Sequence, residues 1–100
     1  MEASSWSLKS LFREKIRLGK EQEFSEVVRE IRSKDLHAQG FISGETLRSI
    51  EDPSMHLVIS TWKSIEDWSN WVTTPERKAF QEQIEAILAQ PTKINAYQYE

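Results

Sequence analysis

The 100-residue chain contains no cysteine and only two histidines, His37 and His56. Without cysteine there is no disulfide framework, no thiolate metal site and no thiol nucleophile. The two histidines do not show the spacing of a metal-binding pair, so we expect no catalytic metal. The sequence also has no glycine-rich phosphate loop and no Ser/His/Asp set, which argues against kinase and hydrolase chemistry.

Long apolar runs are missing as well. No stretch approaches the length of a membrane span, and the first residues, Met-Glu-Ala-Ser-Ser, lack the charged and apolar regions of a signal peptide. We therefore expect a cytoplasmic protein with no membrane partner. Thirteen basic and sixteen acidic side chains give a formal charge of -3 and a pI near 5.4, so no general affinity for nucleic acid is expected.

Aromatic residues are abundant: ten of the 100 residues, four of them tryptophan. With 38% hydrophobic and 29% charged residues, the composition is that of an ordinary globular protein. The length corresponds to one domain over 1–100, of which we expect 1–5 to be flexible. The surplus of aromatic side chains suits a pocket or an interface, although large core residues are the commoner explanation.

Hydrophobic periodicity predicts four strands and two helical regions. Alternation is seen over 6–16 and 93–99, and the segment 40–63 is typical of a hairpin whose two strands are joined by a polar connection that contains Pro53. Helical spacing is seen over about 20–36, after the Ser64 capping signal, and again after Thr74-Pro75. The order β-α-β-β-α-β predicts an α+β, ferredoxin-like fold, an antiparallel sheet with helices on one face.

The strand 55–62 has apolar residues on both sides, with Leu57 and Ile59 on one and Val58 and Trp62 on the other. Helices cover only one face of the sheet, so the other face needs a different partner. A second copy of the chain, packed sheet against sheet, is the simplest cover. By contrast, the charged positions between the apolar stripes of the helices, Arg77 among them, are expected to face solvent.

Several segments together resemble the antibiotic biosynthesis monooxygenase family. They are 18–21 leading to Phe24, 40–45, 57–64, Trp68 with Trp71, and 91–94 with Tyr97. The resemblance spans about residues 8–99, and the strand that ends in Trp-Lys-Ser is its most specific part. It implies a homodimeric α/β barrel with a pocket between sheet and helices in each subunit. The family includes cofactor-independent monooxygenases that act on quinols and polycyclic aromatic polyketides, and also heme-degrading enzymes.

The resemblance also implies site residues. Trp62 matches a tryptophan of the polyketide-oxidising and heme-degrading members, and Arg13 is placed towards the substrate as a cation for a phenolate. Apart from the resemblance, His56 lies on the same side of its strand as Trp62 and is a candidate proton acceptor. Candidate substrate-binding residues are Phe24, Trp68, Phe80 and Gln81. The three candidate catalytic residues also have structural explanations: Trp62 as a core residue, Arg13 as a solvated ion-pair partner and His56 as a side chain at a strand edge.

The leading hypothesis is a monooxygenase without a cofactor that oxidises a small aromatic phenol or quinol, or a polyketide-like substrate, with O2. The main alternative is a non-catalytic dimeric module that binds a small ligand. Heme degradation is a third option. It is disfavoured because Arg13 and Gln81 stand where that branch has asparagine and the histidine that ligates iron.

Overall fold

The computed structural model describes residues 7–100; the residues 1–5 expected to be flexible, and Trp6, lie outside the described part. The elements in chain order are β1 (Leu8–Lys15), α1 (Glu21–Asp35), β2 (Phe41–Arg48), β3 (Met55–Trp62), α2 (Ile65–Val72), α3 (Pro75–Glu85) and β4 (Lys93–Gln98). This confirms the predicted order, with the second helical region divided into α2 and α3.

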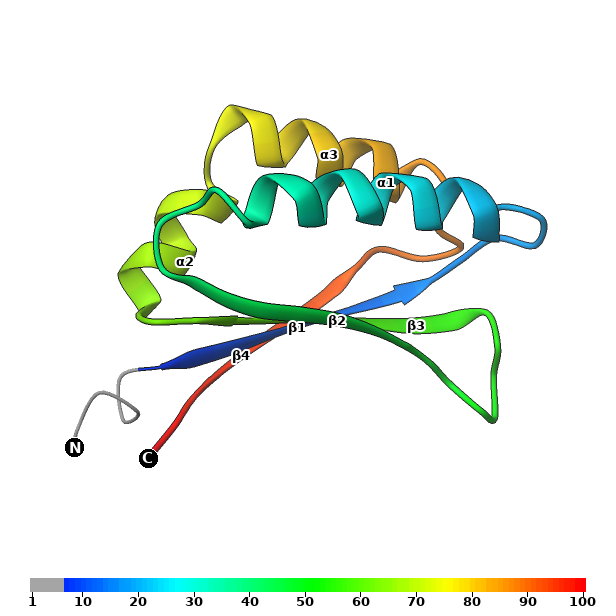
Figure 1. Cartoon of the computed structure of the whole chain (residues 1–100). Helices are drawn as coiled ribbons and strands as arrows, with labels where there is room; N and C mark the ends of the chain where they lie inside the picture. Colours follow the sequence, from blue (N-terminus) through cyan, green and yellow to red (C-terminus); the bar gives the residue numbers. More distant parts are fainter. Residues whose placement is uncertain (1–6) are drawn as a thin grey trace.

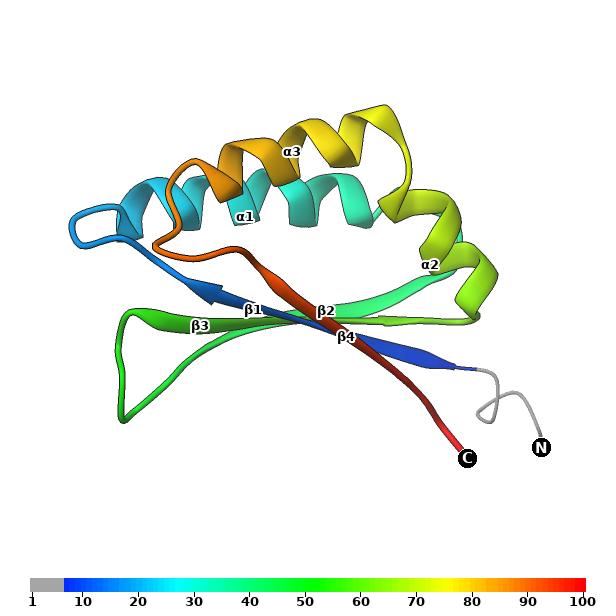
Figure 2. The same cartoon turned by 180° about the vertical axis from the view of Figure 1, so that it is seen from behind.

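The four strands form one antiparallel sheet in the order β2-β3-β1-β4. The three helices lie on the same side of this sheet, and α1 and α3 run next to each other over it (Figure 1). The view from behind shows the opposite face without a covering helix (Figure 2). The ferredoxin-like prediction is therefore confirmed for the single chain.

The helices begin where the sequence signals predict. The Ser64 hydroxyl accepts a hydrogen bond from the Asp67 amide at 3.1 Å, and the Thr74 hydroxyl accepts one from the Arg77 amide at 3.1 Å. Each bond satisfies one of the amide groups that a helix leaves free in its first turn. Pro75 follows Thr74 directly, where its missing amide hydrogen costs nothing. The cap at Thr74 therefore begins α3 as a helix separate from α2.

The core lies between the sheet and the pair α1 and α3. Its members are apolar residues of both helices and of the segments that follow β1 and α3: Ile16, Phe24, Val27, Val28, Ile31, Ile84, Ile87 and Leu88. Short helix α2 contributes no fully buried residue. It therefore closes one end of the layer without being anchored in the core.

Strand alternation divides β1 cleanly. Leu8, Ser10, Phe12 and Glu14 are buried on the helix side, and the residues between them turn to the other face. That open face carries large apolar side chains on all four strands: Leu11, Leu47, Leu57, Ile59 and Tyr97. Within the described residues, no helix combines the length and the apolar character needed to cross a membrane.

Candidate active site

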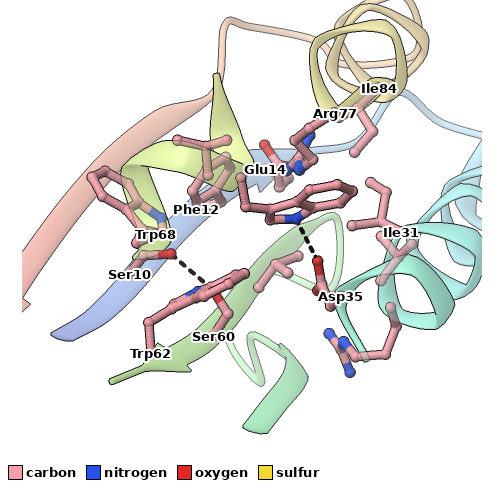
Figure 3. A pocket seen from close by; sticks show the side chains of 15 residues that line it. Ser10, Phe12, Glu14, Ile31, Asp35, Ser60, Trp62, Trp68, Arg77 and Ile84 are labelled. Atoms are coloured by element: carbon pink, nitrogen blue, oxygen red, sulfur yellow. Dashed lines mark hydrogen bonds between the residues drawn. The ribbon is translucent and has the colours of Figure 1, made fainter. Parts of the chain in front are cut away.

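A cavity lies between the sheet and the helices at the α2 end of the layer (Figure 3). Its wall is made by residues of β1, α1, β3, α2 and α3: Ser10, Phe12, Glu14, Val28, Ile31, Arg32, Asp35, Val58, Ser60, Trp62, Trp68, Trp71, Val72, Arg77 and Ile84. The free volume of the cavity is about 30 Å³. This is room for one or two water molecules.

Trp62, the last residue of β3, forms part of the cavity wall. It is 1% exposed, and its Nε1 donates a hydrogen bond to the Ser60 hydroxyl at 2.9 Å. Ser60 in turn lies 3.0 Å from the hydroxyl of Ser10 on the neighbouring strand. Because these residues alternate with open-face residues along their strands, all three point into the layer (Figure 3). The indole is therefore held in one orientation with its polar edge satisfied.

Helix α2 supplies two more indoles, Trp68 and Trp71, both half-buried. Three residues apart, they lie on the same side of the helix. Trp71 Nε1 donates a hydrogen bond to Asp35 Oδ1 at 2.7 Å, the bond that reaches Asp35 in Figure 3. Trp68 Nε1 is buried and has no hydrogen-bond partner among the described residues. A buried donor without a partner is costly, so this N–H is available to a ligand.

Four ionisable side chains also line the cavity: Glu14, Asp35 and Arg77, exposed by only 1%, 5% and 8%, and half-buried Arg32. The guanidinium of Arg77 lies 5.3 Å from the ring centre of Phe12 and donates a hydrogen bond to Gln81 Oε1 at 3.1 Å. Thr92 donates a hydrogen bond of 2.5 Å to Glu14 Oε1. The cavity wall therefore holds two carboxyl groups and two guanidinium groups, and three of these four groups are buried from most water.

Burial decides how these groups titrate. It raises the pKa of Glu14, against the hydrogen bond from Thr92, and raises the pKa of Asp35, against the hydrogen bond from Trp71. It also lowers the pKa of Arg77, although both carboxylates favour the charged guanidinium. Because burial favours the uncharged form of both carboxyl groups, the site can take up a proton at a carboxyl oxygen. Proton transfer with a bound hydroxyl group is the chemistry that this arrangement permits.

Of the site residues expected from the sequence, Trp62 and Trp68 line the cavity. Phe24 and His56 lie together in a neighbouring groove between α1 and the β2 side of the sheet, their ring centres 5.2 Å apart. His56 does face the helices, and burial lowers its pKa, but it does not line the cavity. Phe80 packs against the core instead.

Arg13 lies on the face of the sheet opposite the cavity, which corrects its expected position towards the substrate. It pairs with Leu57 across the strands and is exposed, because residue 13 alternates with buried Phe12 and Glu14. Gln81 also lies outside the cavity wall, and it connects Arg77 to Thr92, to which its Nε2 donates a hydrogen bond at 2.9 Å. It thus supports the ionisable groups and does not touch the cavity.

The sequence interpretation missed Glu14, Asp35 and Arg77. Arg77 was expected to face solvent, yet it is buried. The signal was present in the spacing: each residue falls on the apolar side of its element, with Glu14 two residues after Phe12, Asp35 four after Ile31 and Arg77 seven before Ile84. Burying a charged side chain costs free energy, so a charged residue on an apolar stripe indicates a hydrogen-bonding or ionic partner, or a role in function.

Neither histidine lines the cavity, so among the described residues no imidazole is available there as an axial ligand for heme iron. Within the same residues, no three histidine, aspartate or glutamate side chains come together as a metal site requires.

Comparison with known proteins agrees with this architecture. The structure resembles a conserved protein from Methanosarcina mazei, with a TM-score of 0.91 and 18% identity over 98% of this chain and 97% of that chain. It also resembles SnoaB, a cofactor-independent oxygenase from Streptomyces nogalater, with a TM-score of 0.84 and 14% identity over 95% and 94% of the two chains. Identities this low establish a common fold only.

A sequence search of curated proteins gave no match. The sequence profile described as "Antibiotic biosynthesis monooxygenase", however, matches residues 10–83, which include most of β1, both cavity tryptophans of α2 and Arg77. The chain therefore belongs to the antibiotic biosynthesis monooxygenase family.

Proposed function

We propose that the protein is a monooxygenase that oxidises an uncharged hydroxylated aromatic compound, a phenol, quinol or polyketide-like molecule, with O2 and without a bound cofactor. The observation that carries the proposal is the cavity itself, in which three buried ionisable groups lie among three indoles. Membership in the family and the fold shared with a cofactor-independent oxygenase support it.

The chemistry follows from what the substrate can supply. Loss of the hydroxyl proton leaves an electron-rich anion that reduces O2 directly. For a ring carbon of the anthrone type, one oxygen atom becomes its carbonyl oxygen and the second leaves with the two displaced hydrogens as water. The protein then needs only to position the substrate, exclude water and hold the proton.

The cavity has residues suited to these tasks. Glu14 and Asp35 are the proton acceptors, since burial raises the pKa of both carboxyl groups above the ordinary range. Arg77 and the free N–H of Trp68 stabilise the oxygen that becomes negative. Trp62, fixed by Ser60, supplies a flat surface against which the ring system stacks.

The site must open to admit such a substrate. An engineered protein cavity of about 150 Å³ binds benzene, whereas the space here is about 30 Å³. Helix α2 is the element that can move, because none of its residues is fully buried and it forms the outer wall with Trp68 and Trp71.

Oxygen uptake with a panel of quinols and anthrones tests the proposal. At least one member should be consumed faster than in buffer, and Trp62→Phe should lower turnover while the thermal transition changes little. Tyr99→Phe, an aromatic change outside the cavity, is the matched control. Uptake at the buffer rate for every compound would instead favour the non-catalytic ligand-binding module, and a Soret shift on addition of hemin would favour heme chemistry.

We also propose that the working unit is a homodimer closed through the open face of the sheet. Leu47 and Tyr97 are 47% and 58% exposed there, beside half-buried Leu11, Leu57 and Ile59. An apolar sheet surface shared by four strands is the kind that a two-fold partner covers. Sedimentation at micromolar concentration should give the mass of two chains, and Ile59→Lys should give that of one. A wild-type monomer would contradict this part of the proposal.

A further inference from the structure

The side chain of Trp71 has the features expected of a ligand in this cavity. It is a flat, uncharged, two-ring aromatic group with a single hydrogen-bond donor, and that donor points at a buried carboxylate, Asp35 Oδ1, at 2.7 Å. The group reaches this carboxylate from a helix that has no fully buried residue. Within the described residues, the indole provides the only side-chain hydrogen bond that Asp35 accepts.

A purely structural role would be to attach α2 to α1. That role does not require an ionisable acceptor, because a buried carboxylate loses its hydration and an apolar pair would hold the helices as well. Arg32 and Arg77 favour the charge of Asp35 through space, yet no ion pair within 4 Å joins Asp35 to either of them among the described residues. Burial of the Asp35 carboxylate therefore costs free energy, and the attachment of α2 does not explain why a carboxylate stands at this position.

The free donor of Trp68 adds a second, independent observation. Its Nε1 lies in the wall of the same cavity and is buried without a partner. With Trp71 in place, the cavity keeps only about 30 Å³, so water but no aromatic ligand fits beside the indole to use this donor. The unsatisfied donor and the satisfied carboxylate together describe a site whose ligand position is occupied by the protein itself.

We infer that the indole of Trp71 holds the place of the aromatic substrate, and that the substrate displaces it and donates its hydroxyl hydrogen bond to Asp35. This rests on the proposed function for the identity of the ligand as a substrate. Trp68 Nε1 then donates to a carbonyl or second hydroxyl oxygen of the same molecule.

The same geometry defines the class of ligand. It has at least two fused rings, as the indole does, and a hydroxyl group at the edge that faces Asp35. Its edge towards Asp35 carries no carboxylate or sulfonate, because such a group would place a second negative charge beside that carboxylate.

Calorimetric titration with 2-naphthol in the absence of oxygen tests the inference, with 2-methoxynaphthalene as the ligand that lacks the donor. Trp71→Ala should bind 2-naphthol at least tenfold more tightly than the wild type, because no side chain has to leave first. Trp71→Phe keeps an aromatic wall but removes the competing N–H, so it should show a smaller gain. Ile65→Ala, an exposed position of the same helix, should leave the affinity unchanged.

The wild type should prefer 2-naphthol over 2-methoxynaphthalene by about tenfold or more, since a displaced Trp71 leaves the Asp35 carboxylate without its donor. Equal affinities for the two compounds would show that Asp35 is not the acceptor. Unchanged or weaker binding by both Trp71 variants, or no binding by any of the proteins, would show that the indole is only a wall.

These measurements are independent of turnover. Tight binding by Trp71→Ala together with a lack of oxygen uptake would remove the proposed function and leave the inference standing. Oxidation of quinols together with weakened binding by Trp71→Ala would contradict the inference and leave the proposed function standing.

Discussion

Replacing Arg77 with methionine would test whether the buried charges of the cavity depend on one another. The guanidinium is 8% exposed, lies over the ring of Phe12, and is the cation whose charge both Glu14 and Asp35 favour. Methionine keeps much of the apolar stem of the side chain and removes only its charged end. The change therefore leaves two buried carboxyl groups without their nearest buried cation.

Arg77 makes no ion pair within 4 Å among the described residues, so the loss comes from its hydrogen bond to Gln81 and from its attraction to the two carboxylates. A hydrogen bond from a charged group contributes about 1.5–3 kcal/mol, and the contact of the guanidinium with Phe12 adds about 0.5–2 kcal/mol. A domain of this size has a total free energy of unfolding of about 5–15 kcal/mol. Since each kcal/mol shifts the midpoint by about 4–8 °C, we expect Arg77→Met to lower the melting temperature by at least about 8 °C.

Urea unfolding at pH 7 measures the loss, and a double-mutant cycle with Glu14→Gln measures how much of it belongs to that pair. Lys78→Met, an exposed change of equal charge on the same helix, is the control. The deficit should shrink as the pH falls, because Glu14 and Asp35 take up protons and no longer need the cation. A loss below about 1 kcal/mol, or a coupling energy of zero, would refute the reasoning.

Two further predictions concern single positions. Because burial raises the pKa of Glu14, its folded form holds the proton more tightly, so wild-type stability should fall as the pH rises from about 4.3 through the raised pKa. Urea titrations from pH 4 to 8 should show a smaller fall for Glu14→Gln, in which only the raised pKa of Asp35 remains, and the full fall for Glu30→Gln, an exposed change of equal charge. Gly40→Ala should lower the melting temperature more than Gly19→Ala: both positions have positive φ, but only at residue 40 would the new methyl group collide with Asp67. Equal losses for the two glycines would show that backbone strain alone matters there.

The fold could be predicted from the sequence because its signals are local. Helix caps at Ser64 and Thr74, a period of two in the strands and a helical period over 20–36 each depend on neighbouring residues, and all of them agree. The apolar character of both faces of 55–62 likewise followed from the pattern alone. Nothing in these steps required knowledge of which residues meet across the layer.

The site could be predicted only in part. Trp62 and Trp68 were placed in the cavity wall because alternation and helical spacing fix the face on which a residue lies. Arg13 was placed by a family register, and in a strand a shift of one position exchanges the two faces. Arg77 was expected to face solvent and Asp35 was not considered. Both are buried, and the burial of a charge depends on partners far apart in the sequence.

The indoles and the buried charges of the cavity depend on each other. Three tryptophans exclude water, and it is this exclusion that raises the pKa of Asp35 and makes it a better proton acceptor than an exposed carboxylate. If Trp71 leaves and water enters, the pKa of Asp35 should fall back towards its ordinary value, and the carboxylate becomes a weaker base. A substrate must therefore refill the space that the indole leaves, since only a ring system that keeps water out again restores the basicity on which its own deprotonation depends. Small phenols that enter without sealing the site should bind to it and still react slowly.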